Sequence, residues 1–79
     1  MTLDMLQKGV KANIVANKAP RQLKARLLAL GFIKGNHIEM VSQSLLKSTL
    51  AIRLNRREIY SLRYNEAKQI EIVEIADVS

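Results

Sequence analysis

The alternation of apolar and polar residues predicts short β-strands over most of the chain. Residues 10–16 and 37–43 carry apolar side chains at about every second position, and the pattern recurs at 50–54, 60–62 and 70–75. A period of two is typical of a half-buried strand, because successive side chains point to opposite faces. The pattern therefore predicts five short strands.

Helical spacing replaces this alternation over residues 20–30. Pro20 is expected at the first helical position, where its fixed φ suits a helix and its missing N–H donor costs little. Gly31 is expected to end the helix in a left-handed conformation. One helix is therefore predicted over residues 20–30, with an apolar stripe formed by Leu23, Leu27 and Leu30.

The loop between the third and fourth strands determines which residues face each other. A three-residue loop, 55–57, places Leu50 opposite Leu62, whereas a two-residue loop places Leu50 opposite the polar Ser61. We therefore predict the three-residue loop at an exposed tip. Asn55 is the residue of this loop best able to adopt a left-handed conformation.

Three shorter turns complete the predicted fold. Residues 2–6 are expected to form a capped turn, and Asn65 to cap a helical turn over residues 66–68. Gly35 is expected to take a positive φ in the turn before the second strand. The whole chain, residues 1–79, then forms a single domain: a mainly β, strongly bent antiparallel barrel of about five strands, with the helix closing one side.

Composition narrows the classes of function. The chain has 79 residues, which suits one small domain, and it has no cysteine. Disulfides, cysteine-based zinc sites and thiol nucleophiles are therefore excluded. The opening residues lack a signal-peptide pattern, and every apolar run is far shorter than the roughly 20 residues of a membrane span. We expect a soluble, cytoplasmic protein.

The titratable residues do not suggest an active site. His37 is the sole histidine, and a metal site on it would need Glu39 or Glu71 nearby, so a structural role is favoured. Glu71 and Glu74 fall on opposite faces of the last strand and form no acid–base pair. We predict no enzymatic activity, no metal site and no cofactor.

A formal charge of +6 predicts an acidic partner, such as nucleic acid, an anionic membrane surface or an acidic protein face. The aromatic residues are few, which disfavours base stacking and hence nucleic acid. Two groups of residues are predicted to bind a partner. The helix contributes Arg21, Lys24 and Leu28, and the predicted hairpin contributes Arg53, Arg56 and Arg57.

A characteristic order of residues, most of them small or apolar, runs through nearly the whole chain. Its central part is Arg26-Leu27, Leu30-Gly31-Phe32, Gly35 and Ile38; Gly9, Ala12 and Ile14 precede it, and Leu62-Arg63, Glu66-Ala67, Ile70 and Ile72 follow. In this order the chain resembles the FeoA family, ferrous iron transport proteins A, which are small cytosolic SH3-like domains. Two features depart from the family: residues 42–48 contain neither proline nor glycine, and Asn55 replaces a frequent glycine.

The resemblance implies an accessory protein of bacterial ferrous iron uptake. Such a protein would act by contact with the cytosolic GTP-binding part of the transporter FeoB, at the inner face of the membrane. Two alternatives remain open: an SH3-like module related to metal-dependent repressors, and a basic nucleic-acid-binding small barrel.

Self-association is a further expectation. The last strand, residues 70–75, has apolar residues on both faces, so both faces are expected to be covered. A second copy paired through the strand edges would cover the second face, and so would the helix or the first turn of the same chain.

Overall fold

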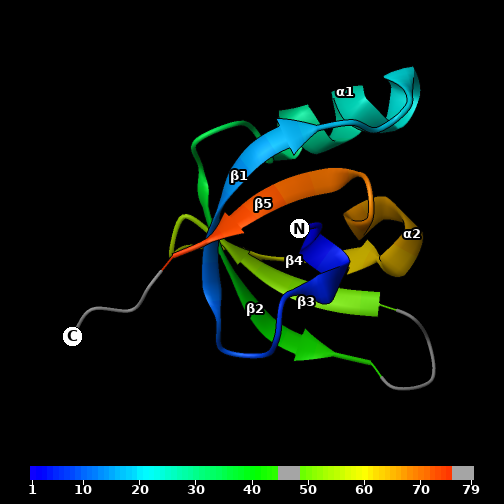
Figure 1. The fold of residues 1–79 in the computed structure, drawn as a ribbon. Helices are drawn as coiled ribbons and strands as arrows, with labels where there is room; N and C mark the ends of the chain where they lie inside the picture. Colours follow the sequence, from blue (N-terminus) through cyan, green and yellow to red (C-terminus); the bar gives the residue numbers. More distant parts are fainter. Residues whose placement is uncertain (45–48, 76–79) are drawn as a thin grey trace.

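The computed structural model describes residues 1–44 and 49–75, which form one antiparallel sheet with a helix beside it (Figure 1). The strands are β1 (Lys11–Asn17), β2 (His37–Gln43), β3 (Thr49–Leu54), β4 (Ile59–Arg63) and β5 (Ile70–Glu74), in the order β4-β3-β2-β1-β5. The helical elements are η1 (Leu3–Met5), α1 (Arg21–Leu30) and α2 (Tyr64–Ala67). The predicted mainly β architecture of five strands and one main helix is confirmed. Part of the loop with neither proline nor glycine, residues 45–48, lies outside the described residues.

The hairpin of β3 and β4 has the predicted register. Leu50 lies opposite Leu62, and the backbone N–H of Leu54 donates to the carbonyl of Glu58 at 2.9 Å, which closes a three-residue loop. Asn55 is left-handed as predicted, with φ +50°, but Arg56 is left-handed too, with φ +62°. The sequence did not predict this second residue, because arginine rarely adopts that conformation.

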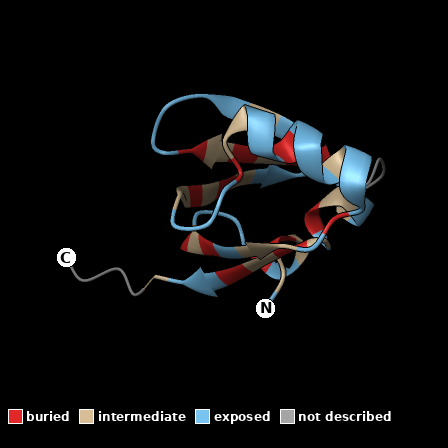
Figure 2. Cartoon of the chain, turned by 90° about the horizontal axis from the view of Figure 1, so that it is seen from above, coloured by how far each residue is buried: buried red, intermediate tan, exposed pale blue. Residues whose placement is uncertain are grey.

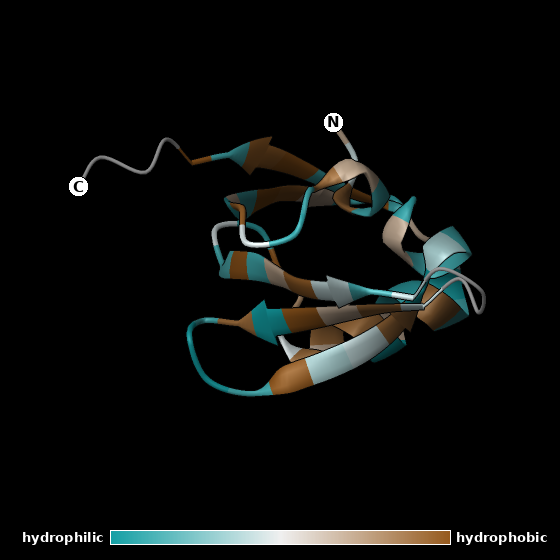
Figure 3. Cartoon of the chain, turned by 90° about the horizontal axis from the view of Figure 1, so that it is seen from below, coloured by the Kyte–Doolittle hydropathy of each residue, from teal (hydrophilic) through white to brown (hydrophobic). Residues whose placement is uncertain are grey.

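Two β-bulges bend the sheet around its core. The register of β1 against β5 shifts between Ile14 and Ala16, and that of β2 against β3 shifts between Met40 and Ser42. A bulge adds one residue to one strand and increases the local twist. Apolar and polar bands alternate along the strands (Figure 3), and the inward side chains form one core. Its members are Leu3, Leu6, Ala12, Ile14, Ala19, Leu27, Phe32, Ile38, Met40, Leu50, Ile52, Leu54, Leu62, Ala67, Ile70 and Ile72.

Helix α1 begins one residue later than predicted. Pro20 has a helical φ of −58° but an extended ψ of 159°, so it occupies the capping position and not the first helical position. Its carbonyl still accepts the first helical hydrogen bond, from the N–H of Lys24 at 2.7 Å. Of the residues in α1, only Leu27 is fully buried, and most of the helix surface is exposed (Figure 2).

Gly31 ends α1 in a left-handed conformation, as predicted, with φ +110°. This conformation lets the N–H of Phe32 donate to the carbonyl of Leu27 at 3.0 Å while the Phe32 side chain is fully buried. Gly35, also as predicted, has a positive φ of +92°. Its N–H donates to the carbonyl of Ile14 at 2.8 Å, so the turn after α1 is joined directly to β1.

The two predicted caps are wrong. Helix α2 begins at Tyr64, one residue before Asn65, because the Glu66 carboxylate reaches back and accepts the N–H of Arg63 at 2.9 Å. A side chain in the third helical position thus satisfies the backbone donor. The Thr2 side chain makes no capping hydrogen bond either, because its hydroxyl donates to the side chain of Asp4.

Strand β5 is shorter than predicted, and the described residues leave Val73 on its second face exposed. Ile75 follows the strand, and Val73 on the outward face is 54% exposed. Neither the helix nor the first turn therefore covers that side chain. The first residues instead cover the strand's edge: the carbonyl of Met1 accepts the N–H of Ile72 at 2.8 Å, and Thr2 pairs with Glu71.

Replacing Gly31 with alanine should lower the free energy of unfolding by about 1–2 kcal/mol, because L-residues are strained at this positive φ. A Cβ there would also lie 2.7 Å from the Leu54 Cδ2 atom, so Leu54 would have to move. Gly35→Ala is the matched control, because φ is again positive but nothing lies within 4 Å of the added carbon. Urea unfolding should show a larger loss for Gly31→Ala; equal losses would show that the contact with Leu54 adds nothing.

Candidate functional site

The predicted helix group lies on the solvent side of α1. Arg21 and Lys24 are exposed, and Leu28 is 40% exposed although it is a large apolar residue. Neither cation forms an ion pair with a described residue. The spacing of the three residues places them on one stripe. The structure therefore presents an apolar side chain beside two unpaired positive charges.

The predicted hairpin group is divided between the tip and the sheet. Arg56 and Arg57 are exposed at the tip, and neither forms an ion pair with any residue of the described ranges. Arg53 lies on β3, half-buried, with its guanidinium 4.0 Å from the carboxylate of Glu39 on β2. Only the tip residues are thus free to meet the charge of a partner.

The two groups are joined at one end of α1. Gly31 packs directly on Leu54, the residue before the hairpin tip. The end of α1 that carries Leu28 therefore lies toward the hairpin. Arg21 is at the opposite end, about 10 Å further along the helix at 1.5 Å per residue. The structure thus brings Leu28 nearer to the tip than it brings the helix cations.

Asn55 connects the tip to β2 through two hydrogen bonds. Its backbone N–H donates to the carbonyl of His37 at 2.8 Å, and its side-chain oxygen accepts the His37 N–H at 2.9 Å. The Asn55 side chain therefore makes a hydrogen bond that glycine could not make, and asparagine also tolerates the left-handed backbone. This role was not predicted from the sequence, because it depends on the approach of a strand 18 residues away.

His37 sits in a surrounding that disfavours its charged form. Its Nδ1 atom is buried and has no hydrogen-bond partner among the described residues. Burial lowers the pKa of His37, the positive charges of Arg56 and Lys11 lower it further, and Glu39 opposes them. A neutral imidazole at neutral pH follows from this arrangement.

The carboxylates considered as partners of His37 are engaged elsewhere. Glu39 faces Arg53, and the Glu71 carboxylate lies 2.7 Å from the Lys18 ammonium. The hydrogen bond from Lys18 lowers the pKa of Glu71. In the part of the chain that the structure describes, no three histidine, aspartate or glutamate side chains gather into a metal-binding group.

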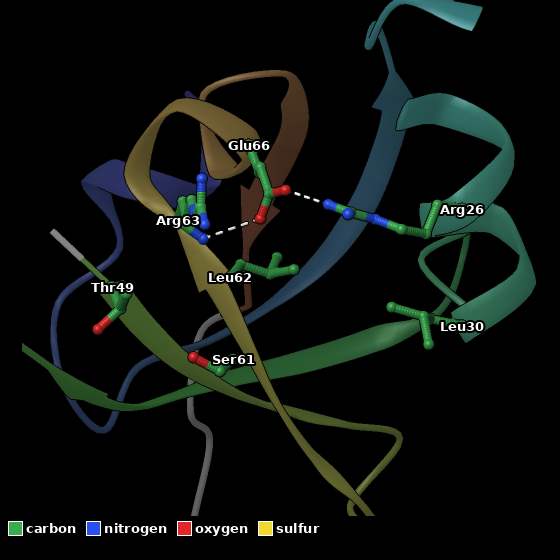
Figure 4. Close-up of a pocket in the computed structure, with 7 residues that line it drawn as sticks. All are labelled: Arg26, Leu30, Thr49, Ser61, Leu62, Arg63 and Glu66. Carbon is green, nitrogen blue, oxygen red and sulfur yellow. Dashed lines mark hydrogen bonds and ion pairs between the residues drawn. The ribbon is translucent and has the colours of Figure 1, made fainter. Parts of the chain in front are cut away.

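A cavity of about 360 Å³ was not predicted from the sequence (Figure 4). Helix α1, strands β3 and β4, and helix α2 contribute its walls, so no local pattern could reveal it. Glu66 forms an ion pair with Arg26 across the cavity, while Arg63 has no ion-pair partner among the described residues. The lining residues are Arg26, Leu30, Thr49, Ser61, Leu62, Arg63 and Glu66.

No helix within residues 1–44 and 49–75 has the length and apolar character needed to cross a membrane.

Comparisons with known proteins agree with the resemblance seen in the sequence. The model of the FeoA domain family matches residues 1–74. A Campylobacter jejuni protein that bears the name Fe(2+) transport protein A is 42% identical over 72 residues. The match covers 91% of this chain and 96% of that protein.

Solved structures show the same fold. Stenotrophomonas maltophilia FeoA, described as a prokaryotic SH3 domain protein and solved with zinc, is 26% identical with a TM-score of 0.80, over 92% of this chain and 89% of that one. The SH3-like fold is therefore confirmed. A manganese-dependent transcriptional repressor is 12% identical with a TM-score of 0.83, over 95% of this chain and 36% of the repressor. That likeness concerns the fold alone.

The lowered pKa of His37 should make stability depend on pH. The unfolded state, with a pKa near 6.5, binds the proton more tightly than the folded state, so stability is lost as pH falls below about 6.5 toward the folded pKa. Replacing His37 with glutamine should reduce the pH dependence of the free energy of unfolding, measured between pH 7 and pH 5. An unchanged pH dependence in the variant would assign it to other groups.

Arg56→Gly should stabilise the fold by about 1 kcal/mol, because glycine is unstrained at the left-handed φ of this position. Arg57→Gly is the control: it removes the same charge from the same loop at a residue without a positive φ. It should be neutral or destabilising, because glycine increases the freedom of the unfolded chain. Thermal unfolding of both variants measures the difference, and equal shifts would refute strain at Arg56.

Proposed function

Since the chain belongs to the FeoA family of non-enzymatic transport accessory proteins, we propose that it serves bacterial ferrous iron uptake by binding the cytosolic GTP-binding domain of a FeoB-type transporter. The protein then works in the cytoplasm, at the inner face of the membrane. It acts by contact and biases the assembly or the nucleotide cycle of the transporter.

The exposed face of α1 is the observation that carries the proposal. A helix held to the core by one fully buried residue leaves Leu28 for another protein to cover. Lys24 and Arg21 lie on the same stripe, toward the beginning of the helix, and Arg56 and Arg57 provide positive charge at the hairpin tip. Charges at the rim of an interface mainly raise the association rate, whereas a buried apolar side chain contributes affinity.

The charge distribution also favours an acidic protein surface. The formal charge is +6, and the tip arginines, Arg21 and Lys24 have no ion pairs among the described residues. An acidic face on the transporter domain would attract these groups, and salt would screen the attraction. Nucleic acid would be attracted by the same charges, but the chain supplies few aromatic side chains for stacking.

Leu28→Glu should weaken binding to the cytosolic domain about tenfold or more, since burying a leucine is worth about 1.5–3 kcal/mol and each 1.4 kcal/mol is tenfold. Binding is measured by titration of the purified transporter domain at low and high salt. Val73→Glu is the matched control, because it places the same charge at an exposed apolar residue on β5.

The control variant should bind as the unchanged protein does, and affinity should fall as salt rises. A folded Leu28→Glu variant that keeps full affinity would exclude the helix face. Absence of binding by the unchanged protein at low salt would overturn the proposed transporter contact.

A further inference from the structure

Strand β4 is an edge of the sheet, and the outward backbone groups of Ile59 and Ser61 have no partner among the described residues. The bond between Leu54 and Glu58 fixes the alternation of the ladder, so Tyr60 and Leu62 direct their N–H and C=O groups toward β3. Ile59 and Ser61 direct theirs away from the sheet. No hydrogen bond joins these four outward groups to any described residue.

The 360 Å³ cavity runs beside this edge (Figure 4). Its walls come from β4 on one side and from Arg26 and Leu30 of α1 on the other. Leu30 and Leu62 provide apolar surface, while Ser61 of β4 and Thr49 of β3 provide hydroxyl groups. The edge therefore borders a groove that has room for side chains of an added segment.

Each end of the edge carries an arginine that has no ion pair among the described residues, next to a carboxylate that is bonded elsewhere: Glu58 accepts the Tyr60 hydroxyl, and Glu66 pairs with Arg26. Arg63 lies at one end and Arg57 at the other, six residues away, or about 20 Å at 3.3 Å per residue. Neither guanidinium forms an ion pair with a residue of the described ranges. Pairing β4 with β4 of a second copy, antiparallel about Ser61, would place Arg63 opposite Ile59 and diagonal to the copy's Arg57, so it would bring like charges near each other without supplying the carboxylates that an acidic segment supplies.

We propose that the free edge of β4 binds an extended, acidic segment of a partner protein as an added sixth strand. The segment would exchange backbone hydrogen bonds with Ile59 and Ser61, and its acidic residues would meet the arginines at the two ends. The inference rests on the proposed function only for the identity of the partner, because the chemistry of the edge is independent of it.

Amide hydrogen exchange, followed by NMR, tests the pairing directly. The probe is the blocked peptide EEVTVTEE, and the control is KKVTVTKK. The acidic peptide should slow exchange at the amides of Ile59 and Ser61, while those of Tyr60 and Leu62, already bonded to β3, should change little. N-methylation should abolish binding when it removes the peptide N–H groups that face β4. N-methylation of the alternate residues, whose N–H groups face away from β4, should not.

Ser61→Pro removes one outward N–H without removing a bond to β3, so binding of the acidic peptide should weaken about tenfold. Ser61→Ala keeps the N–H and should bind as the unchanged protein does. If the proline variant fails to fold, the N-methylated peptides test the same hydrogen bonds from the other side.

Four results would overturn the inference: equal binding of the basic peptide, binding without protection of Ser61, no binding at all, or concentration-dependent protection of Ser61 in the protein alone. The last result would assign the edge to a second copy. If the peptide fails while the transporter domain still binds, the proposed function stands and this inference falls. If the peptide binds and the transporter domain does not, the reverse holds.

Discussion

The left-handed turn at Gly31 is the constraint on which the rest of the structure depends. It reverses the chain after α1, so that Leu27 and Phe32 can both enter the core while their backbones share a hydrogen bond. Beyond it, Gly35 bonds to β1, and the chain enters β2 already aligned. A few residues with little conformational choice therefore position the helix, the first two strands and the hairpin that Gly31 contacts.

This arrangement explains why so much of α1 remains available. Because the turn at Gly31, the buried Leu27 and the partly buried Leu23 and Leu30 anchor the helix, its remaining side chains are not part of the core. A helix attached in this way can change its outer face with little cost to the fold. The helix also forms one wall of the groove beside β4, so the same element contributes to both proposed contacts.

Much of the fold followed from the sequence because the relevant signals are local. Alternating apolar residues gave the strands, and the loop arithmetic gave Leu50 opposite Leu62. The errors have physical causes. Asn65 looked like a cap, but the helix begins one residue earlier, where Glu66 accepts the N–H of Arg63 from inside the helix. Arg56 takes a conformation that its own preference opposes, because the hairpin register and the bonds of Asn55 impose it.

The functional surfaces were predicted less completely. The exposure of Leu28 was readable from helical spacing, because that signal lies within one element. The cavity was not, since Arg26 and Ser61 are far apart in the sequence and meet only after the sheet has bent. The free hydrogen-bonding groups of β4 depend on the strand order, which no single segment specifies.

The two margins of the sheet are treated differently, and this limits how molecules of the protein can assemble. Met1 and Thr2 occupy the margin at β5, while the margin at β4 stays open in the described structure. Unlimited stacking into a fibre needs two open margins on every molecule. In this protein a molecule that adds a strand at β4 offers no second open margin to the next molecule. The first residues of the chain would therefore restrain polymerisation in a concentrated solution.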